Sequence, residues 1–249
     1  MILTHLIFFP EKAFFQTPED YHLSYENAFL DTADGAKLHG WFLPAEKEKG
    51  VLLFLHGNAG NIGGRLFKAK GWIERGFSVF LIDYRSYGKS EGEIKHQDDI
   101  YRDAETAFNW LMKEKKYSLP QIILYGESIG TAPAVKLASE HKVWAVILEA
   151  PFTSFLDLVK VHYPFAPPVM LKDFIFSNID RIADIKAPLF ILHGTHDEIC
   201  PFLGADLLME KAPDPKELYV IQHGQHNDLP AHAGSDYWDR PLAFLEKHK

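Results

Sequence analysis

The chain has 249 residues, of which 47% are hydrophobic, and it carries a formal net charge of −8 at pH 7. This length and hydrophobic content suffice for one large core. The negative charge argues against a nucleic-acid partner, because nucleic-acid binding normally needs a basic face. Cys200 is the only cysteine, which excludes an intramolecular disulfide, and we interpret it as a packing residue.

Residues 1–10 are apolar but too short to span a bilayer, and they lack the basic start and cleavage site of a secretory signal. We expect this segment to pack on the domain of a cytoplasmic protein. The alternative is that it is the last part of a membrane anchor, which would make the protein membrane-associated.

In chain order, the first expected elements are two strands at residues 25–30 and 37–43, joined by the hairpin turn Asp34-Gly35. A strand at 51–55 precedes a helix that ends near Gly76, and the apolar run at 77–82 is typical of a strand covered on both faces. The next helix places core residues at helical spacing: Ile100, Ala104, Ala107, Phe108, Leu111 and Met112.

Further strands are expected to begin at Gln121, Trp144, Pro188 and Glu217, and a last helix covers residues 236–247. This alternation predicts an α/β fold with a mostly parallel sheet of eight strands and helices on both faces. We expect a single domain over residues 1–249.

The most informative motif is Gly126-Glu127-Ser128-Ile129-Gly130, because an apolar strand precedes it and a helical stretch follows it. Gly-x-Ser-x-Gly in this context is typical of a nucleophile held on a sharp turn. The flanking glycines remove Cβ atoms that would collide in such a turn, and the helix N-terminus favours developing negative charge. We therefore predict that Ser128 is a nucleophile.

A serine nucleophile needs a base that takes its proton and an acid that orients the base. On this kind of turn the expected order is serine, acid, histidine. Asp197 lies in the loop after the apolar strand that ends at Gly194, and His226 lies in a loop after the strand that begins at Glu217. Both loops open at the same edge of a parallel sheet as Ser128, so we predict a triad of Ser128, Asp197 and His226.

Two other residues compete for these roles. Glu149 lies at the end of a strand, and its place in the chain also suits a triad acid. We favour Asp197, because a loop beyond a strand leaves room for a carboxylate to reach an imidazole, and we interpret Glu149 as a structural anchor for the segment that follows. His223 is the competing base, but it lies nearer the strand end than His226, and we interpret it as bonded to the backbone.

The spacings His193-x-x-His196 and His223-x-x-His226 also suggest a metal site. Metal-ligating pairs of this kind usually need helical i, i+4 spacing or a tight knuckle, and neither fits loops at strand ends. We therefore predict no metal site and no cofactor.

The chain resembles the α/β-hydrolase superfamily over nearly its whole length, and above all compact serine hydrolases that include bacterial esterases and eukaryotic protein depalmitoylases. The resemblance rests on the three loops above, on His56-Gly57-Asn58-Ala59-Gly60-Asn61 and on Asp83-Tyr84-Arg85-Ser86-Tyr87-Gly88-Lys89-Ser90. It implies the same triad. The chain departs from it at Ser86, where relatives usually carry glycine, so we expect a stiffer loop there.

Acyl transfer also needs backbone N–H donors aimed at the oxygen that becomes negative. One donor is expected to be the N–H of Ile129, the residue after the nucleophile. By similarity to the family, the other is expected at Asn58, in the loop after the strand at 51–55. The alternative is that Gly57, Gly60 and the two asparagines merely form a turn.

A cap insertion at about residues 152–185 breaks the alternation of strands and helices and is rich in aromatic side chains and prolines. Because the segment leaves from the catalytic edge of the sheet, we expect it to lie over Ser128 and to form an apolar wall for an acyl group. The alternative is an aromatic segment that only packs on the core.

Together these features predict a serine hydrolase that cleaves a small-molecule carboxylic ester or thioester, with a short acyl chain, through an acyl-enzyme intermediate. A peptidase or amidase could use the same triad. The alternative from another class is a non-catalytic ligand-binding protein on the hydrolase fold, because fold does not fix function.

Overall fold

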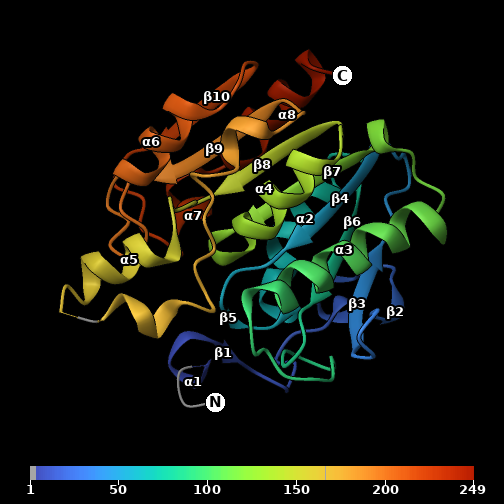
Figure 1. Ribbon diagram of the computed structural model, residues 1–249. Coiled ribbons are helices and arrows are strands. Elements are labelled where there is room, and N and C mark those ends of the chain that lie inside the picture. The colour runs from blue at the N-terminus through green and yellow to red at the C-terminus, as the bar shows by residue number, and fades with distance from the viewer. Residues whose placement is uncertain (1–3, 166) are drawn as a thin grey trace. The chain divides into compact units, whose positions relative to one another are not determined.

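The computed structural model describes residues 4–165 and 167–249 (Figure 1). Contacts between residues divide the chain into two compact units, the first ending at Ile123 and the second beginning at Leu124. The single domain over residues 1–249 stays a prediction.

The helices and strands of the first unit are α1 (Thr4–Ile7), β1 (Phe9–Pro10), β2 (Glu26–Asp31), β3 (Lys37–Leu43), β4 (Gly50–Leu55), β5 (Ala59–Gly60), α2 (Leu66–Ile73), β6 (Phe77–Asp83) and α3 (Gln97–Lys113). Short 3-10 helices lie between them: η1 (Pro18–Tyr21), η2 (Ile62–Arg65) and η3 (Leu119–Gln121). The main-sheet strands of this unit lie in the order β4-β6-β3-β2. β4 and β6 are parallel, whereas β3 is antiparallel to both β6 and β2.

β4 and β6 form the centre of this unit, because every one of their residues is buried. The helix α3 begins after His96, whose Nδ1 accepts a hydrogen bond from the Asp98 N–H at 3.2 Å. Asp98 and Asp99 place negative charge in its first turn, where the helix dipole favours it. The apolar positions predicted from helical spacing are buried, except that Met112 is half-buried.

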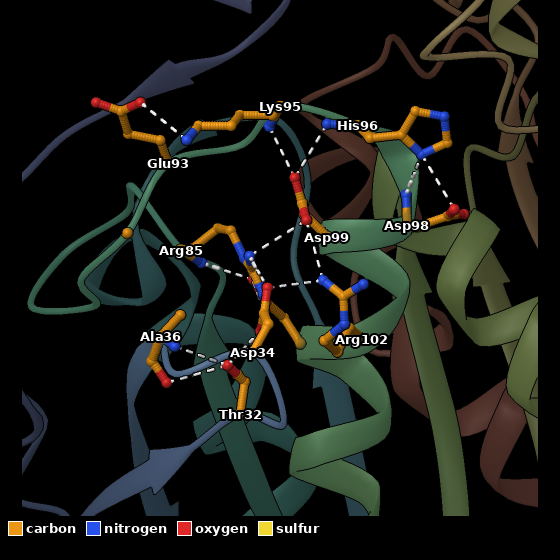
Figure 2. A network of polar contacts seen from close by, with 12 residues as sticks. Thr32, Asp34, Ala36, Arg85, Glu93, Lys95, His96, Asp98, Asp99 and Arg102 are labelled. Carbon is orange, nitrogen blue, oxygen red and sulfur yellow. Dashed lines mark hydrogen bonds and ion pairs between the residues drawn. The ribbon is translucent and has the colours of Figure 1, made fainter.

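A buried arginine joins the β2–β3 turn to α3. Arg85 binds Asp34 at 2.8 Å, Asp99 at 3.2 Å and Asp103 at 2.7 Å. Figure 2 shows Asp34 and Asp99 also reaching Arg102, at 2.8 and 3.0 Å. Hydrogen bonds from Arg85 hold the pKa of Asp34 well below its usual range. This network fixes the backbone directly after β6.

Asp83, the last residue of β6, is fully buried. Its Oδ1 accepts a hydrogen bond from the Ile62 N–H at 3.0 Å and lies 3.6 Å from His56 Nε2. His56 Nδ1 lies 2.7 Å from the Gly57 carbonyl oxygen, which can only accept, so the hydrogen is on Nδ1 and Nε2 faces the carboxyl group as an acceptor. Burial raises the pKa of Asp83 to about 8, which favours the protonated acid at neutral pH.

We expect Asp83→Asn to flatten the pH dependence of stability. The unfolded chain releases this proton near pH ~4, whereas the folded chain holds it up to about pH 8. The folded state therefore binds more protons in this range, and the free energy of unfolding falls as pH rises, by up to ~1.4 kcal/mol per pH unit. Asparagine keeps an acceptor for Ile62 but cannot ionise. Denaturant unfolding across this pH range measures the slope, with Asp31→Asn at an exposed position as the control; an unchanged slope in Asp83→Asn would contradict the expectation.

The described part of the N-terminal segment packs on the first unit. Ile7 and Phe8 are buried, and β1 pairs in parallel with β5. The Asn58 side chain holds this segment, because its Nδ2 donates to the Ile7 carbonyl oxygen at 2.5 Å and its Oδ1 accepts from the Phe9 N–H at 3.3 Å. Residues 1–3, which belong to the same predicted segment, lie outside the described residues.

The second unit contains β7 (Ile122–Glu127), which begins at the boundary, α4 (Thr131–Glu140), β8 (Ala145–Glu149), α5 (Phe155–His162), β9 (Leu189–Gly194), α6 (Leu203–Lys211), β10 (Lys216–Ile221), α7 (Leu229–Ala233) and α8 (Asp236–Lys247). Its 3-10 helices are η4 (Ser128–Gly130), η5 (Pro168–Leu171) and η6 (Ile182–Asp184). The strand order is β10-β9-β8-β7, and β10, β9 and β8 are parallel. Their carboxyl ends therefore meet at one edge, where the loops after β9 and β10 begin.

The predicted fold class is confirmed. The described strands include the eight of the main sheet, which is mixed because β3 runs antiparallel to its neighbours. Helices pack on these strands: α2 on β6 in the first unit, and α4 on β8 and α6 on β10 in the second. Among residues 4–165 and 167–249, no helix has the length and apolar character needed to cross a bilayer.

Candidate active site

Ser128 stands on a sharp turn between β7 and α4. Its φ is 53°, in the left-handed region that side chains other than glycine rarely occupy. A Cβ on Gly126 would lie 2.6 Å from the Gly130 carbonyl oxygen and 2.7 Å from Thr131 Cα, so the first glycine of the motif is required for this turn. The Thr131 hydroxyl donates to the Ser128 carbonyl oxygen at 2.6 Å and fixes the turn from the helix side.

The structure brings Ser128, His226 and Asp197 together. His226 Nδ1 lies 2.7 Å from Asp197 Oδ2, and His226 Nε2 lies 3.0 Å from Ser128 Oγ. An ionised carboxylate can only accept, so the hydrogen belongs on Nδ1 and the lone pair of Nε2 faces the serine hydroxyl. The imidazole is therefore oriented as a base for Ser128.

Backbone N–H groups that closely follow Asp197 in its loop bind one oxygen of its carboxylate. Its Oδ1 accepts from the N–H groups of Ile199 at 2.9 Å and Cys200 at 2.7 Å. Burial alone would raise the pKa of Asp197, but hydrogen bonds from His193 and His226 hold it well below its usual range. The carboxylate is thus charged at neutral pH although its side chain is buried.

His193 contributes to this arrangement in a way that sequence reasoning missed. It ends β9 in full burial, with Nε2 2.8 Å from the Cys200 carbonyl oxygen and 3.3 Å from Asp197 Oδ2. Because the carbonyl only accepts, Nε2 carries a hydrogen, which also points toward the carboxylate. The sequence signal was its place at the strand end, four residues before Asp197, but we weighed this histidine only as a metal ligand.

Glu149, the competing acid, is bonded elsewhere. Its Oε2 accepts from the hydroxyls of Tyr125 at 2.6 Å and Tyr237 at 2.7 Å. Burial raises the pKa of both tyrosines, so both remain donors. Glu149 thereby ties β8 to β7 and α8, which is an anchoring arrangement.

The histidines of the two spaced pairs lie in different surroundings. His223 has a φ of 59°, and its ring lies 5.0 Å from that of His196. It is His226 of this loop that reaches Ser128. Within the part of the chain that the structure describes, no group of three or more His, Cys, Asp or Glu side chains could hold a metal ion.

The two expected oxyanion donors belong to different units, so the oxyanion hole stays a prediction. Ile129 follows Ser128 in the turn and is buried. Asn58 lies in the first unit, where its carbonyl oxygen accepts from the Tyr87 hydroxyl at 2.6 Å. Ser86, the departure from the family pattern, has a φ of 74°, which explains why glycine suits this position.

The insertion contacts the site at two points. Asn178 donates from Nδ2 to the Thr131 hydroxyl at 3.0 Å and to the Phe152 carbonyl oxygen at 2.9 Å, which joins the insertion to the serine turn. His162, at the end of α5, bonds the Ile199 carbonyl oxygen of the acid loop at 2.9 Å. A cap over Ser128 with an apolar wall stays a prediction.

Beside His226 lies a cavity of about 260 Å³. The loops after β9 and β10 supply its lining: His196, Glu198, Ile199, Gln225, His226, Asn227 and Asp228. Cys200 is buried in the first of these loops, and burial raises the pKa of its thiol. A buried, protonated thiol has no nucleophilic role here, as expected for a packing residue.

The sequence is similar to those of known α/β-hydrolase proteins. Residues 46–172 match the model of a family described as serine aminopeptidase, S33. The chain is 35% identical over 258 residues to the alpha/beta hydrolase domain-containing protein WAV2 of Arabidopsis thaliana, covering 95% of this chain and 83% of that one. It is 35% identical over 202 residues to the human alpha/beta hydrolase domain-containing protein 17B, covering 80% and 67%.

Solved structures share the fold. The esterase Pf2001 of Pyrococcus furiosus gives a TM-score of 0.78 at 21% identity, over 97% of both chains. The alpha/beta hydrolase GrgF from Penicillium sp. sh18 gives 0.76 at 20% identity, over 91% of this chain and 99% of that one. Because the family model and relatives of 35% identity cover the region that builds the serine turn, this chain belongs to the α/β-hydrolase family.

Proposed function

We propose that the protein is a serine hydrolase that cleaves a carboxylic ester or thioester of a small molecule through an acyl-enzyme intermediate. The observation that carries the proposal is the chain of two hydrogen bonds, of 2.7 and 3.0 Å, from Asp197 through His226 to the Ser128 hydroxyl. In it, Ser128 is the nucleophile, His226 the base and Asp197 the residue that fixes the imidazole tautomer.

The reaction proceeds in two halves. Ser128 Oγ attacks the acyl carbon while its proton moves to His226 Nε2, and the Asp197 carboxylate stabilises the resulting imidazolium. The tetrahedral intermediate collapses when the bond to the leaving alkoxide or thiolate breaks, and His226 returns the proton to that group. Water then gives a proton to His226 and attacks the acyl-enzyme, which releases the acid and restores the Ser128 hydroxyl. The N–H groups of Ile129 and Asn58 are the proposed donors to the oxyanion, and no cofactor takes part.

The second candidate is amide or peptide hydrolysis on the same triad. The description of the matched family model as serine aminopeptidase favours it. A non-catalytic ligand-binding protein fits less well, because such a protein does not need the serine, histidine and aspartate to share one hydrogen-bond chain.

We expect p-nitrophenyl esters with acyl chains of roughly two to six carbons to be the best substrates, since the insertion is too short for a large lid and its aromatic and proline-rich content favours a short, rigid apolar pocket. Each methylene that fits should lower the activation free energy that governs kcat/KM by about 1 kcal/mol, and the first that does not fit should reverse the trend. The measurement is kcat/KM for esters, thioesters and aminoacyl amides of graded chain length, each below its micelle concentration. A maximum at about twelve carbons would point to a long groove instead. Amides outperforming all esters would replace the esterase proposal with the second candidate.

A further inference from the structure

The end of α5 and the segment after it have an unusual distribution of charge. Residues 161–171 contain no Asp, Glu, Lys or Arg, and a lysine stands directly on either side, at Lys160 and Lys172. Both lysines are exposed.

Among the side chains whose burial the structure describes here, the buried ones lie at the end of the segment. Leu171 and, just beyond it, Phe174 and Phe176 are 5%, 2% and 0% exposed. Phe176 meets the rings of Phe174 and Phe155 at 6.3 and 6.2 Å, which anchors the segment to the second unit. The apolar side chains of the middle, by contrast, face water: Val161 is 59% exposed, Tyr163 68%, Phe165 97% and Val169 70%.

α6 adds two exposed apolar side chains beside Val161. Val161 lines a cavity of about 470 Å³ together with Leu203 and Leu207, which are 64% and 39% exposed. The cavity therefore lies between α5 and α6. The apolar face is defined as Val161, Tyr163, Phe165 and Val169, four exposed apolar side chains within nine residues of sequence, with Leu203 and Leu207 beside Val161. A cluster of exposed apolar side chains usually marks a contact with a protein or a membrane.

We propose that the apolar face inserts into the interfacial region of a lipid bilayer. A tyrosine and a phenylalanine at the tip suit the headgroup boundary, where amphipathic and aromatic side chains concentrate. Lys160 and Lys172 can extend their ammonium groups to lipid phosphates while the stretch between them enters the boundary. Pro164 and Pro167 restrict the backbone, so little chain entropy is lost on insertion.

The charges around the apolar face predict whether binding needs anionic lipid. Asp157 lies 3.3 Å from Lys160, and Glu210 and Lys211 border the cavity as a pair of opposite sign. The local charge therefore nearly cancels, and the whole chain carries a net charge of −8. Apolar insertion should dominate, so binding needs no anionic lipid and resists salt.

The test is flotation of the purified full chain with vesicles of pure phosphatidylcholine, in low and in high salt. We expect the wild type to float in both, and Phe165→Ser to lower the partition coefficient about tenfold or more, because a fully exposed phenylalanine loses its insertion. Phe29→Ser on β2, at a position 67% exposed, is the matched control and should float as the wild type does. Unchanged circular dichroism of both variants shows that they fold.

This inference does not rest on the proposed function, and Ser128→Ala should float as the wild type does. A wild type that stays out of the vesicle fraction overturns the proposal. Equal loss in Phe165→Ser and Phe29→Ser also overturns it. If sedimentation velocity shows a wild-type dimer that Phe165→Ser dissociates, and neither protein floats, the apolar face is a contact between copies of this chain instead.

Discussion

Ser128→Ala should lower turnover of the best ester by about six orders of magnitude, the loss seen when a triad nucleophile is removed. In the proposed mechanism the hydroxyl supplies the attacking oxygen, and its 3.0 Å contact to His226 would let the proton pass directly to the imidazole. A fluorophosphonate probe should label the wild type once per chain, and peptide mapping should place the label on Ser128. The alanine variant should take up no label.

Ser86→Gly is the matched control for this experiment. It also removes a serine hydroxyl from a position of positive φ, 74° against 53° at Ser128. Glycine suits that backbone, so the variant should fold, bind the probe and turn over substrate normally. Labelling of another serine, or appreciable turnover by Ser128→Ala, would remove Ser128 from the mechanism.

Asp197→Asn should lower kcat by about 10⁴, as the same change does in a serine-protease triad. The N–H groups of Ile199 and Cys200 at Oδ1 should keep the amide oxygen on their side. The amide nitrogen then faces His226 Nδ1 and donates to it, which moves the imidazole hydrogen to Nε2. Nε2 can then no longer accept the serine proton.

Glu149→Gln is the comparison, because it neutralises the other buried acid of this edge. Glutamine keeps an oxygen for Tyr125 and Tyr237, so kcat should fall much less, with the main effect on thermal stability. Steady-state kinetics and thermal unfolding of both variants decide between the two acids. The reverse ranking of kcat would assign the triad acid to the end of β8.

The sequence predicts the elements and the meeting of the three loops well, because both follow from local patterns. The last helix spans Asp236–Lys247 as predicted, and the run of buried residues in β6 matches its continuous apolar sequence. Strands that are parallel deliver their following loops to one edge. The order of Ser128, Asp197 and His226 along the chain, together with their places in loops beyond strand ends, therefore predicted which side chains meet, while their catalytic roles stay proposals.

What the sequence could not predict depends on the direction of side chains between distant elements. His193 was considered only as a metal ligand, and it is the direction of its side chain that brings Nε2 to the acid loop. Asn58 was expected for its backbone, yet its side chain bonds residues 7 and 9, which lie 51 and 49 positions earlier in the sequence. Phe165 departs from expectation in another way. An apolar ring is normally buried, but the structure leaves this ring 97% exposed.

The buried state of Cys200 has a practical consequence for spectroscopy. Its protonated, inaccessible thiol should be inert to maleimides, so the natural chain behaves as if it had no cysteine. Any cysteine introduced on the surface then becomes the sole attachment point for a fluorophore or spin label, without removal of the native one. Two cysteines introduced at chosen surface positions could therefore be labelled for distance measurements while Cys200 stays in place.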